Sequence, residues 1–455
     1  MRTKVIIFIC IMLSVASCLK VPDEADENGI ILPGAEVFHP NTQNITVKNA
    51  VSITFSGEQA VVNNPFESFG VTVNVDKQNV TISATVSDFE AEINYVLSGI
   101  TANGSVKIYS DYKIGLVLNG VSIQNPIGAA INIQSSKKVS VTLVDKTQNR
   151  LVDEGVFEMT GGERMNGTLY SEGQLVFDGA GSLLVYGNYS HAICVHDYIE
   201  IDNGNIQVFH AKSDGIHCRK YFQMYGGSMV INAKSDGVEC TNGYVTINGG
   251  AIKISNAAGV GIKSNENLTI TGGRIEIEAR DGIRAEGNIV VTGGEIYCNS
   301  DRSGIVSNRA IAVAGGRIVA SATRNVFDSG NNIFSITGGT AIGVGGATIM
   351  PTTSECRQRS VVWGASKFTA GQLMSIKSSN DSEVLTFKLP KAYSGSMTLI
   401  FTSPLLQANT TYTIYKGGSV SGGVDLHGLY SGAVSSGGTA AATFTTSNMI
   451  TTVGI

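Results

Sequence analysis

Residues Leu268 to Gly287 carry the sequence "LTITGGRIEIEARDGIRAEG", and this stretch decides the fold. Apolar residues alternate with polar ones on both sides of a glycine doublet; they are Leu268, Ile270, Ile275 and Ile277. This period of two is typical of half-buried β-strands. The doublet Gly272–Gly273 allows the positive φ that a corner requires. The stretch therefore predicts a unit of strand, turn, strand, turn and short strand.

The unit recurs along the chain at one period. Corners that follow an alternating apolar run end at Gly181, Gly204, Gly227, Gly250, Gly273, Gly294, Gly316 and Gly339, at intervals of 21 to 23 residues. A period in this range indicates a solenoid. A coil of 22 residues at about 3.3 Å per residue has a contour of roughly 70 Å, enough for three sides. No segment of ten residues looks helical, so we predict a parallel β-helix.

The repeat also divides the chain into regions. We expect a signal peptide at 1–17, a tether at 18–44, and a parallel β-helix at 45–350. Residues 45 to 150 are irregular coils or an N-terminal cap. The repeat register stops after residue 350, and we expect a β-rich cap or small domain at 351–455, which covers an otherwise adhesive sheet edge.

Composition limits the classes of function. Of the 455 residues, 42% are hydrophobic and 15% are charged, which is enough apolar material for a large core and argues against disorder. The formal net charge of -5 provides no basic footprint for nucleic acid. We therefore exclude DNA and RNA as partners and expect a globular, monomeric protein.

The N-terminal sequence predicts export. "MRTKVIIFICIMLSVASC" has two basic residues, a short apolar run and small residues before Cys18, the order found in secretory signals. A buried first strand is the alternative. "VASC" resembles the bacterial lipobox, which implies cleavage before Cys18 and lipid attachment to its thiol. We expect an extracytoplasmic protein, held by this lipid anchor on the bacterial outer membrane or the cell surface.

Five further cysteines follow residue 18 and the signal region. They are Cys194, Cys218, Cys240, Cys298 and Cys356. An odd number without any Cys-x-x-Cys pair argues against a disulfide framework and against a zinc site. We expect small buried thiols.

Aligning the coils places acidic residues at one corner. Asp214, Asp236 and Asp281 each precede a glycine, whereas Val260 and Ser303 occupy this position in other coils. Carboxylates one strand spacing apart, about 4.8 Å, repel by roughly 3.5 kcal/mol at an effective dielectric constant of 20. Calcium bound by Asp214, Asp236 and Asp281 is one way to neutralise them, since Ca²⁺ prefers oxygen ligands.

Nearby basic residues are the second way to neutralise these carboxylates. Lys212 and Lys234 each stand two residues before an aspartate, and Arg280 and Arg302 flank Asp281 and Asp301. No dense loop of EF-hand type is present. The residues alone favour the basic partners.

A second ladder follows three positions later in each coil. It comprises Cys194, His217, Glu239, Lys263, Arg284 and Val306, and its inward neighbours are small: Val195, Cys218, Cys240, Ser264, Ala285 and Ser307. Mixed charges along one ridge suit a solvated face. They equally suit the binding of an extended acidic polymer by Lys263, Arg284 and the pair Lys212 and Lys234, beside His217 and Glu239. Tyrosines that could stack on sugars are Tyr221, Tyr225, Tyr244 and Tyr297.

No catalytic motif stands out. The chain has no GxSxG elbow, HExxH helix or Walker loop. His191, His196, His210 and His217 occur within 27 positions, but their spacing fits neither a metal-binding helix nor a catalytic triad. We therefore expect turn or surface histidines.

The chain resembles a known family over residues 45 to 450. The segments "LVLNGVSIQN" (Leu116 to Asn125), "AINIQSSKKVSVTL" (Ala130 to Leu143) and "SNMITTVG" (Ser447 to Gly454), with the repeated DGI/V corners, are similar to bacterial carbohydrate-binding lipoproteins related to a clostridial polygalacturonate- and cellulose-binding β-helix. The resemblance implies a right-handed parallel β-helix that binds Ca²⁺ at acidic corners, here Asp214, Asp236 and Asp281. Val260 and Ser303 depart from that pattern.

Together these features predict a lipid-anchored protein that binds polysaccharide, with acidic plant-type glycans as the leading class. A calcium-dependent polysaccharide lyase is the first alternative, with Lys263 or Arg284 as the base that removes a proton from the sugar. A structural adhesin or spacer without a glycan site is the second. We favour a binder over an enzyme.

Overall fold

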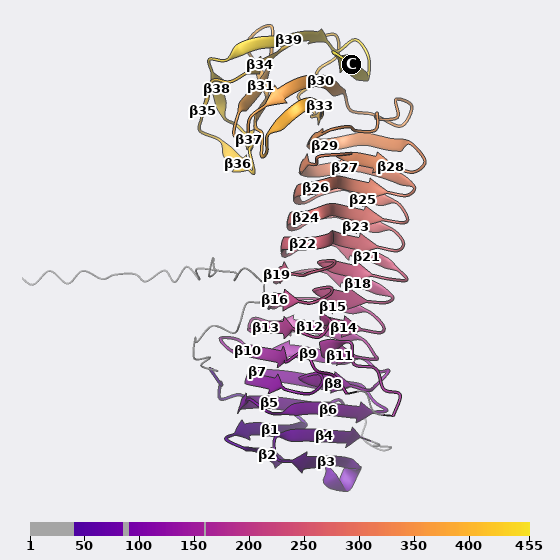
Figure 1. The fold of residues 1–455 in the computed structure, drawn as a ribbon, viewed down its shortest axis with the longest axis vertical. Coiled ribbons are helices and arrows are strands. Elements are labelled where there is room, and N and C mark those ends of the chain that lie inside the picture. Colours follow the sequence, from indigo (N-terminus) through magenta and orange to yellow (C-terminus); the bar gives the residue numbers. More distant parts are fainter. Residues whose placement is uncertain (1–40, 85–90, 159–160) are drawn as a thin grey trace, which may run out of the picture. The chain divides into compact units, whose positions relative to one another are not determined.

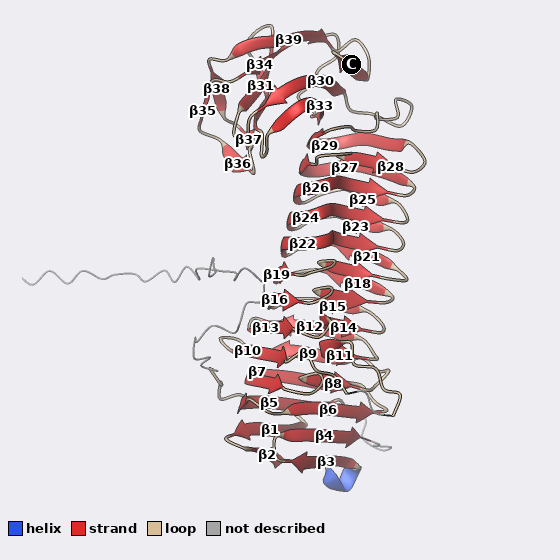
Figure 2. Ribbon diagram, in the orientation of Figure 1, coloured by secondary structure: helices blue, strands red, loops and turns tan. Residues whose placement is uncertain are grey.

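The computed structural model describes residues 41–84, 91–158 and 161–455, which form one compact unit. The predicted signal peptide, Cys18 and most of the tether lie outside these residues. Among the described residues, no helix is long and apolar enough to cross a membrane. Strands dominate this unit, and one short 3₁₀ helix, η1 (Glu67–Phe69), accompanies them (Figure 2).

The first part of the unit consists of hairpins and irregular coils. Its strands are β1 (Ala50–Ser56), β2 (Gln59–Asn63), β3 (Val71–Asp76), β4 (Asn79–Ala84), β5 (Ile93–Thr101), β6 (Ser105–Ser110), β7 (Ile114–Asn125), β8 (Ile131–Ile133), β9 (Val139–Leu143) and β10 (Gln148–Asp153). The pairs β1–β2 and β3–β4 are antiparallel, whereas β1–β5 and β4–β6 are parallel. Two hairpins therefore begin the stack, and parallel coils follow, as expected for residues 45 to 150.

The regular coils form the middle of the chain (Figure 1). Their strands are β11 (Gly167–Ser171), β12 (Leu175–Gly179), β13 (Ser182–Gly187), β14 (His191–Val195), β15 (Ile199–Ile201), β16 (Asn205–Ala211), β17 (Ile216–Cys218), β18 (Tyr221–Met224), β19 (Ser228–Asn232), β20 (Val238–Cys240), β21 (Tyr244–Ile247), β22 (Ala251–Ser264), β23 (Leu268–Ile270), β24 (Arg274–Ala285), β25 (Ile289–Val291), β26 (Glu295–Ser307), β27 (Ala310–Ser321), β28 (Phe327–Ser329) and β29 (Ile333–Gly345). Each pairs in parallel with its equivalent in a neighbouring coil. The predicted parallel β-helix is confirmed, with about 11 turns between residues 79 and 344.

The glycine corners and the inward ladder explain this regularity. Gly273 has a φ of 85°, and a Cβ there would lie 2.9 Å from the carbonyl oxygen of Gly250 in the preceding coil. Small residues fill the inward ladder at the tight corner and are at most 1% exposed; they are Val195, Cys218, Cys240, Ser264, Ala285 and Ser307. All five cysteines that follow the signal region are buried free thiols, as predicted.

The C-terminal part is mainly antiparallel. Its strands are β30 (Ser360–Phe368), β31 (Leu373–Ser378), β32 (Glu383–Lys388), β33 (Tyr393–Thr402), β34 (Thr411–Lys416), β35 (Ser419–Ser421), β36 (Val424–Leu426), β37 (Leu429–Ser431), β38 (Val434–Ser436), β39 (Thr439–Thr445) and β40 (Ile450–Val453). A six-stranded sheet has the order β36-β37-β32-β31-β34-β39. Strand β33 pairs antiparallel with β29 and so covers part of the last coil's edge.

A second contact fixes the C-terminal part to the coils. The His427 ring stacks on Tyr297 of β26 at 3.8 Å between ring centroids, and His427 Nε2 lies 3.1 Å from Glu276 Oε1 of β24. Arg317 of β27 donates to the carbonyl oxygen of Leu429 at 3.1 Å. The C-terminal part is thus tied to three coils, and through β33 also to the end of the stack.

Candidate functional site

One column of parallel strands carries both predicted ladders. Strands β14, β17, β20 and the final parts of β22, β24 and β26 follow one another in this column. Its register places four predicted residues on consecutive coils, in the order His217, Glu239, Lys263 and Arg284. We call these four residues the charged ridge.

The buried aspartates beside this ridge have a structural task that the sequence did not reveal. Asp214 Oδ1 accepts the backbone N–H of Asp236 at 3.0 Å, and Asp236 Oδ1 accepts that of Val260 at 2.6 Å. Asp281 Oδ1 accepts the N–H of Ser303 at 3.2 Å. The three aspartates are only 2% to 6% exposed. Each therefore uses one oxygen to join its coil to the next, and the second oxygen remains for other partners.

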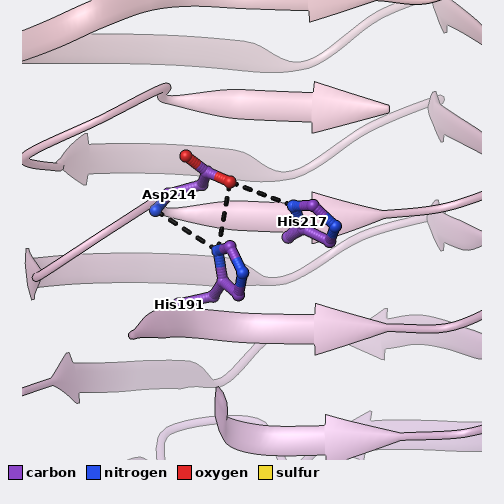
Figure 3. A group of neighbouring side chains, drawn as sticks. All are labelled: His191, Asp214 and His217. Carbon is purple, nitrogen blue, oxygen red and sulfur yellow. Dashed lines mark hydrogen bonds and ion pairs between the residues drawn. The ribbon is translucent and has the colours of Figure 1, made fainter. Parts of the chain in front are cut away.

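The second oxygen of Asp214 faces two imidazoles (Figure 3). Oδ2 lies 3.1 Å from His191 Nδ1 and 3.0 Å from His217 Nδ1, and the two rings are 4.2 Å apart between centroids. Burial opposes ionisation of Asp214, but its hydrogen bonds with both imidazoles hold its pKa well below the ordinary value. The Asp214 carboxylate is therefore ionised, and the two imidazoles are the groups that stabilise its negative charge.

The network continues along the charged ridge. His217 Nδ1 also lies 3.2 Å from Glu239 Oε2, and the Lys263 ammonium lies 2.6 Å from Glu239 Oε1 and 3.2 Å from Asp236 Oδ2. Burial lowers the pKa of His217, but contacts with Asp214 and Glu239 outweigh it and raise the pKa to about 9. Two cationic groups, His217 and Lys263, are thus shared among three carboxylates, Asp214, Asp236 and Glu239.

Asp281 has guanidinium partners instead. Arg302 Nε donates to Asp281 Oδ1 at 2.8 Å, its Nη2 contacts Oδ2, and Arg280 Nε lies 3.4 Å from Oδ2. The predicted pairing of Arg280 with Asp281 is confirmed, whereas Arg302, expected beside Asp301, pairs with Asp281 of the preceding coil. Within the described chain, by contrast, Lys212 and Lys234 make no ion pair, and both are exposed.

The exposed side of the site is richer in cations than the buried side. The Lys263 and Arg284 side chains are 37% and 35% exposed, whereas the Asp214 and Asp236 side chains are 3% and 8% exposed. Arg284 Nε lies 3.4 Å from Glu286 Oε1, which partly offsets its charge. The surface therefore presents Lys263 and Arg284 near the covered carboxylates of Asp214 and Asp236, with the exposed carboxylate of Glu286 beside Arg284.

The predicted tyrosines have different environments. Tyr221 is stacked between Tyr198 and Tyr244, with centroid distances of 4.3 Å and 5.1 Å, so both of its faces are covered. Tyr297 is covered by His427 and is 7% exposed. Tyr225 and Tyr244 are 49% and 38% exposed. These two are the predicted tyrosines that could contact a sugar.

A polar hollow lies at the turns that follow strands β22 and β24, which carry Lys263 and Arg284. Its volume is about 440 Å³, and it is lined by Asn265, Glu266, Asn267, Glu286, Gly287 and Arg309. The turn containing Glu286 is linked to the ridge by the contact with Arg284. Amide and charged groups at such a place can hydrogen-bond to sugar hydroxyls.

Two clusters in the described residues have ligand atoms close enough to hold a metal ion. One consists of His191, Asp214 and His217, and the other of Asp214, Asp236 and Glu239. Asp281 belongs to neither, because the coil with Val260 separates it from Asp236 and Arg302 pairs with it.

Of the three predicted calcium corners, Asp214 and Asp236 lie in a cluster whose ligand atoms are close enough for a metal ion, together with Glu239, whereas Asp281 does not. Calcium takes six to eight oxygen ligands, whereas nitrogen atoms of His217 and Lys263 already contact the acidic cluster. Acidic and histidine groups suited to a metal are present, but with a donor set different from the predicted one.

Two site features were not anticipated. His191 was expected to be a turn or surface residue, yet it stands opposite Asp214 in the same ladder, one period earlier. The 23-residue interval between them was the signal that could have found it. Lys263, named as a base for lyase chemistry, has its pKa raised; burial lowers it, but Glu239 and Asp236 more than compensate. A protonated ammonium cannot accept a proton.

The fold and site define an all-β repeat protein with a ladder of charged residues along one column of its coils. A model of the family "Carbohydrate-binding domain-containing protein" matches residues 76–325, more than half of the chain, and the chain belongs to this family. The predicted family resemblance is thereby confirmed.

Among solved structures, the chain is similar to a polysaccharide lyase-like protein from C. thermocellum, determined as a gadolinium derivative. The sequence identity is 26% and the TM-score 0.48, over 53% of this chain and 96% of that chain. A search of curated proteins finds no match.

Proposed function

We propose that this protein binds an acidic polysaccharide along the charged ridge while a lipid on Cys18 holds it outside the cytoplasm. The observation that carries the glycan part is the arrangement of exposed cations near buried carboxylates. Membership of the carbohydrate-binding family supports a polysaccharide as the partner. The signal-like N-terminus and its lipobox support export and anchoring to the outer membrane or cell surface.

The repeat makes the ridge suitable for a polymer. Successive ridge residues are about 4.8 Å apart, the spacing between neighbouring strands, which is close to the length of one sugar unit in an extended chain. Lys263 and Arg284 stand on adjacent coils. A uronate chain that runs along the stack would meet two positive groups, Lys263 and Arg284, on neighbouring coils.

Exposed residues beside the ridge extend this surface. Lys212 and Lys234 occupy equivalent turns of two adjacent coils and have exposed side chains without an ion pair among the described residues. Because their ammonium groups are uncompensated, they add attraction for an anionic polymer at low ionic strength. Tyr244, the first residue of β21, adds a ring that is 38% exposed.

The test is binding of polygalacturonate and of a neutral glucan to the full chain in detergent. We expect retention of polygalacturonate that weakens with salt, and little retention of the neutral glucan. The triple variant Lys212→Ala, Lys234→Ala, Arg284→Gln should bind about tenfold more weakly, because each exposed charge pair contributes about 0.5 kcal/mol.

A matched variant controls for net charge. Lys77, Lys113 and Lys253 are exposed lysines outside the ridge, and replacing them with alanine removes the same number of positive charges. Equal losses in both triple variants would refute the ridge as the site. Absorbance from unsaturated uronides during the assay would indicate a lyase, and retention of neither glycan would favour a structural spacer.

A further inference from the structure

Three ligand atoms converge at one point on the surface of the coils. Asp214 Oδ2, His191 Nδ1 and His217 Nδ1 point toward one another from two adjacent coils (Figure 3). The side chains of His191 and His217 are 14% and 22% exposed, and that of Asp214 is 3% exposed. The Asp214 carboxylate is thus held in place by the backbone N–H of Asp236, and the partly exposed imidazoles allow access from solvent.

His191 Nδ1 makes two contacts that require opposite protonation states of this nitrogen. Its Nδ1 accepts the backbone N–H of Asp214 at 3.3 Å, which requires a free lone pair. The same atom lies 3.1 Å from Asp214 Oδ2, a contact that requires a proton on Nδ1. One nitrogen cannot satisfy both demands. A cation between the nitrogen and the carboxylate would resolve the conflict, because a metal ion displaces any proton on the imidazoles, that of His217 included, and neutral imidazole and carboxylate are both metal ligands.

The geometry and the donor types agree on the class of cation. Zinc bonds of about 2.0–2.1 Å at tetrahedral angles place neighbouring ligand atoms about 3.3 Å apart. The carboxylate oxygen lies 3.1 Å and 3.0 Å from the two imidazole nitrogens. Imidazole suits zinc and related transition metals, whereas calcium selects oxygen.

We propose that His191, Asp214 and His217 form a binding site for a divalent transition metal ion of the Zn²⁺ class. Three protein ligands leave a coordination position for water or for an oxygen of a bound molecule. Glu239 Oε2, 3.2 Å from His217 Nδ1, adds a carboxylate at the edge of the site. The absence of Cys-x-x-Cys pairs argued against zinc, but the imidazoles of two coils replace the thiolates. The site does not depend on glycan binding.

The experiment is calorimetric titration of the full chain, stripped of metal by a chelator, with Zn²⁺ and separately with Ca²⁺. We expect one Zn²⁺ per chain and no comparable binding of Ca²⁺. His191→Ala and His217→Ala should each weaken Zn²⁺ binding at least tenfold. His196→Ala is the matched control, because His196 contacts a single carboxylate, Glu172, at 3.3 Å without a second imidazole ligand. It should retain full affinity.

X-ray absorption of the zinc-loaded natural chain tests the site without any substitution. We expect two imidazole ligands with nitrogen at about 2.0–2.1 Å. No stoichiometric Zn²⁺ binding, unchanged affinity in both folded histidine variants, or a spectrum without two imidazoles would overturn the proposal. Glycan retention is measured separately, so failure here would leave the proposed function intact, and failure of retention would leave the metal site intact.

Discussion

Asp214 and Asp281 occupy the same ladder position and share one task but differ in their surroundings. Both are 2% exposed, and both use Oδ1 to accept a backbone N–H of the next coil. The second oxygen of Asp281 meets permanent guanidinium charges, whereas that of Asp214 meets imidazoles. The fold therefore requires only one oxygen of each carboxylate. The second oxygen can pair with a permanent charge, as at Asp281, or with imidazoles, as at Asp214, and imidazoles can bind protons and metal ions.

Removing the two carboxylates should separate these roles most strongly. Asp214→Ala leaves the backbone N–H of Asp236 and two partly buried imidazoles without their acceptor. We expect the free energy of unfolding to fall by about 3–5 kcal/mol, as when one member of a buried ion pair is removed. Asp281→Ala should cost about 1–3 kcal/mol, because water can reach Arg302 and replace its partner. Urea unfolding followed by circular dichroism measures both, and equal losses would contradict the comparison.

A carboxylate inserted between the two regions should have the next largest effect. Val260 stands in the ladder between Asp236 and Asp281 and is 5% exposed. Val260→Asp would place a third carboxylate between Asp236 and Asp281, one strand spacing of about 4.8 Å from each. Because the three charges repel, we expect the free energy of unfolding to be about 3 kcal/mol lower than in Val260→Asn. The asparagine variant has the same shape without the charge. Identical unfolding midpoints of the two variants would show that the ladder carboxylates do not repel.

Lowering the pH should produce the smallest of these changes in stability, through the pairing of Asp281 with Arg302. Burial raises the pKa of Asp281, but Arg302 and Arg280 lower it below its ordinary value. A lowered folded-state pKa stabilises the protein above the unfolded-state value of about 3.9, and this stabilisation is lost as the pH falls through the folded-state value. We expect Arg302→Gln to lose about 1 kcal/mol of stability at neutral pH and to lose less than the natural chain between pH 4 and pH 2. Parallel stability curves in urea would refute this coupling.

The fold followed from local features of the sequence. The glycine corners at 21- to 23-residue intervals and the alternation around Ile275 and Ile277 were sufficient for the coil and for its register, including the ladder from His217 to Arg284. These features could be predicted because each coil packs only on its neighbours, so one period contains nearly all the information.

The site was less predictable, because its contacts depend on which way each side chain points from its coil, and the spacing of residues in the sequence does not give that. Arg280 was identified beside Asp281, and the structure agrees, whereas Arg302, identified beside Asp301, pairs with Asp281 of the preceding coil. Lys212 and Lys234 stand two residues before their aspartates in sequence, yet they are exposed outside the network. Lys263 instead contacts Asp236 and Glu239 of the preceding coil. His191 was missed because its coil lacks the Asp-Gly corner that defined the alignment. Tyr297 was covered by His427, a contact between distant segments that no repeat encodes.

The antiparallel pairing of β29 with β33 also determines how long the molecule can be. A parallel stack has no intrinsic last member, because each coil offers its successor the same hydrogen-bonding edge. Strand β33 reverses the direction at that edge and occupies part of the place where a further coil would dock. Strand β33 therefore ends the stack: it limits the number of repeats in one chain and covers an edge that could otherwise pair with another molecule and start end-to-end growth into filaments.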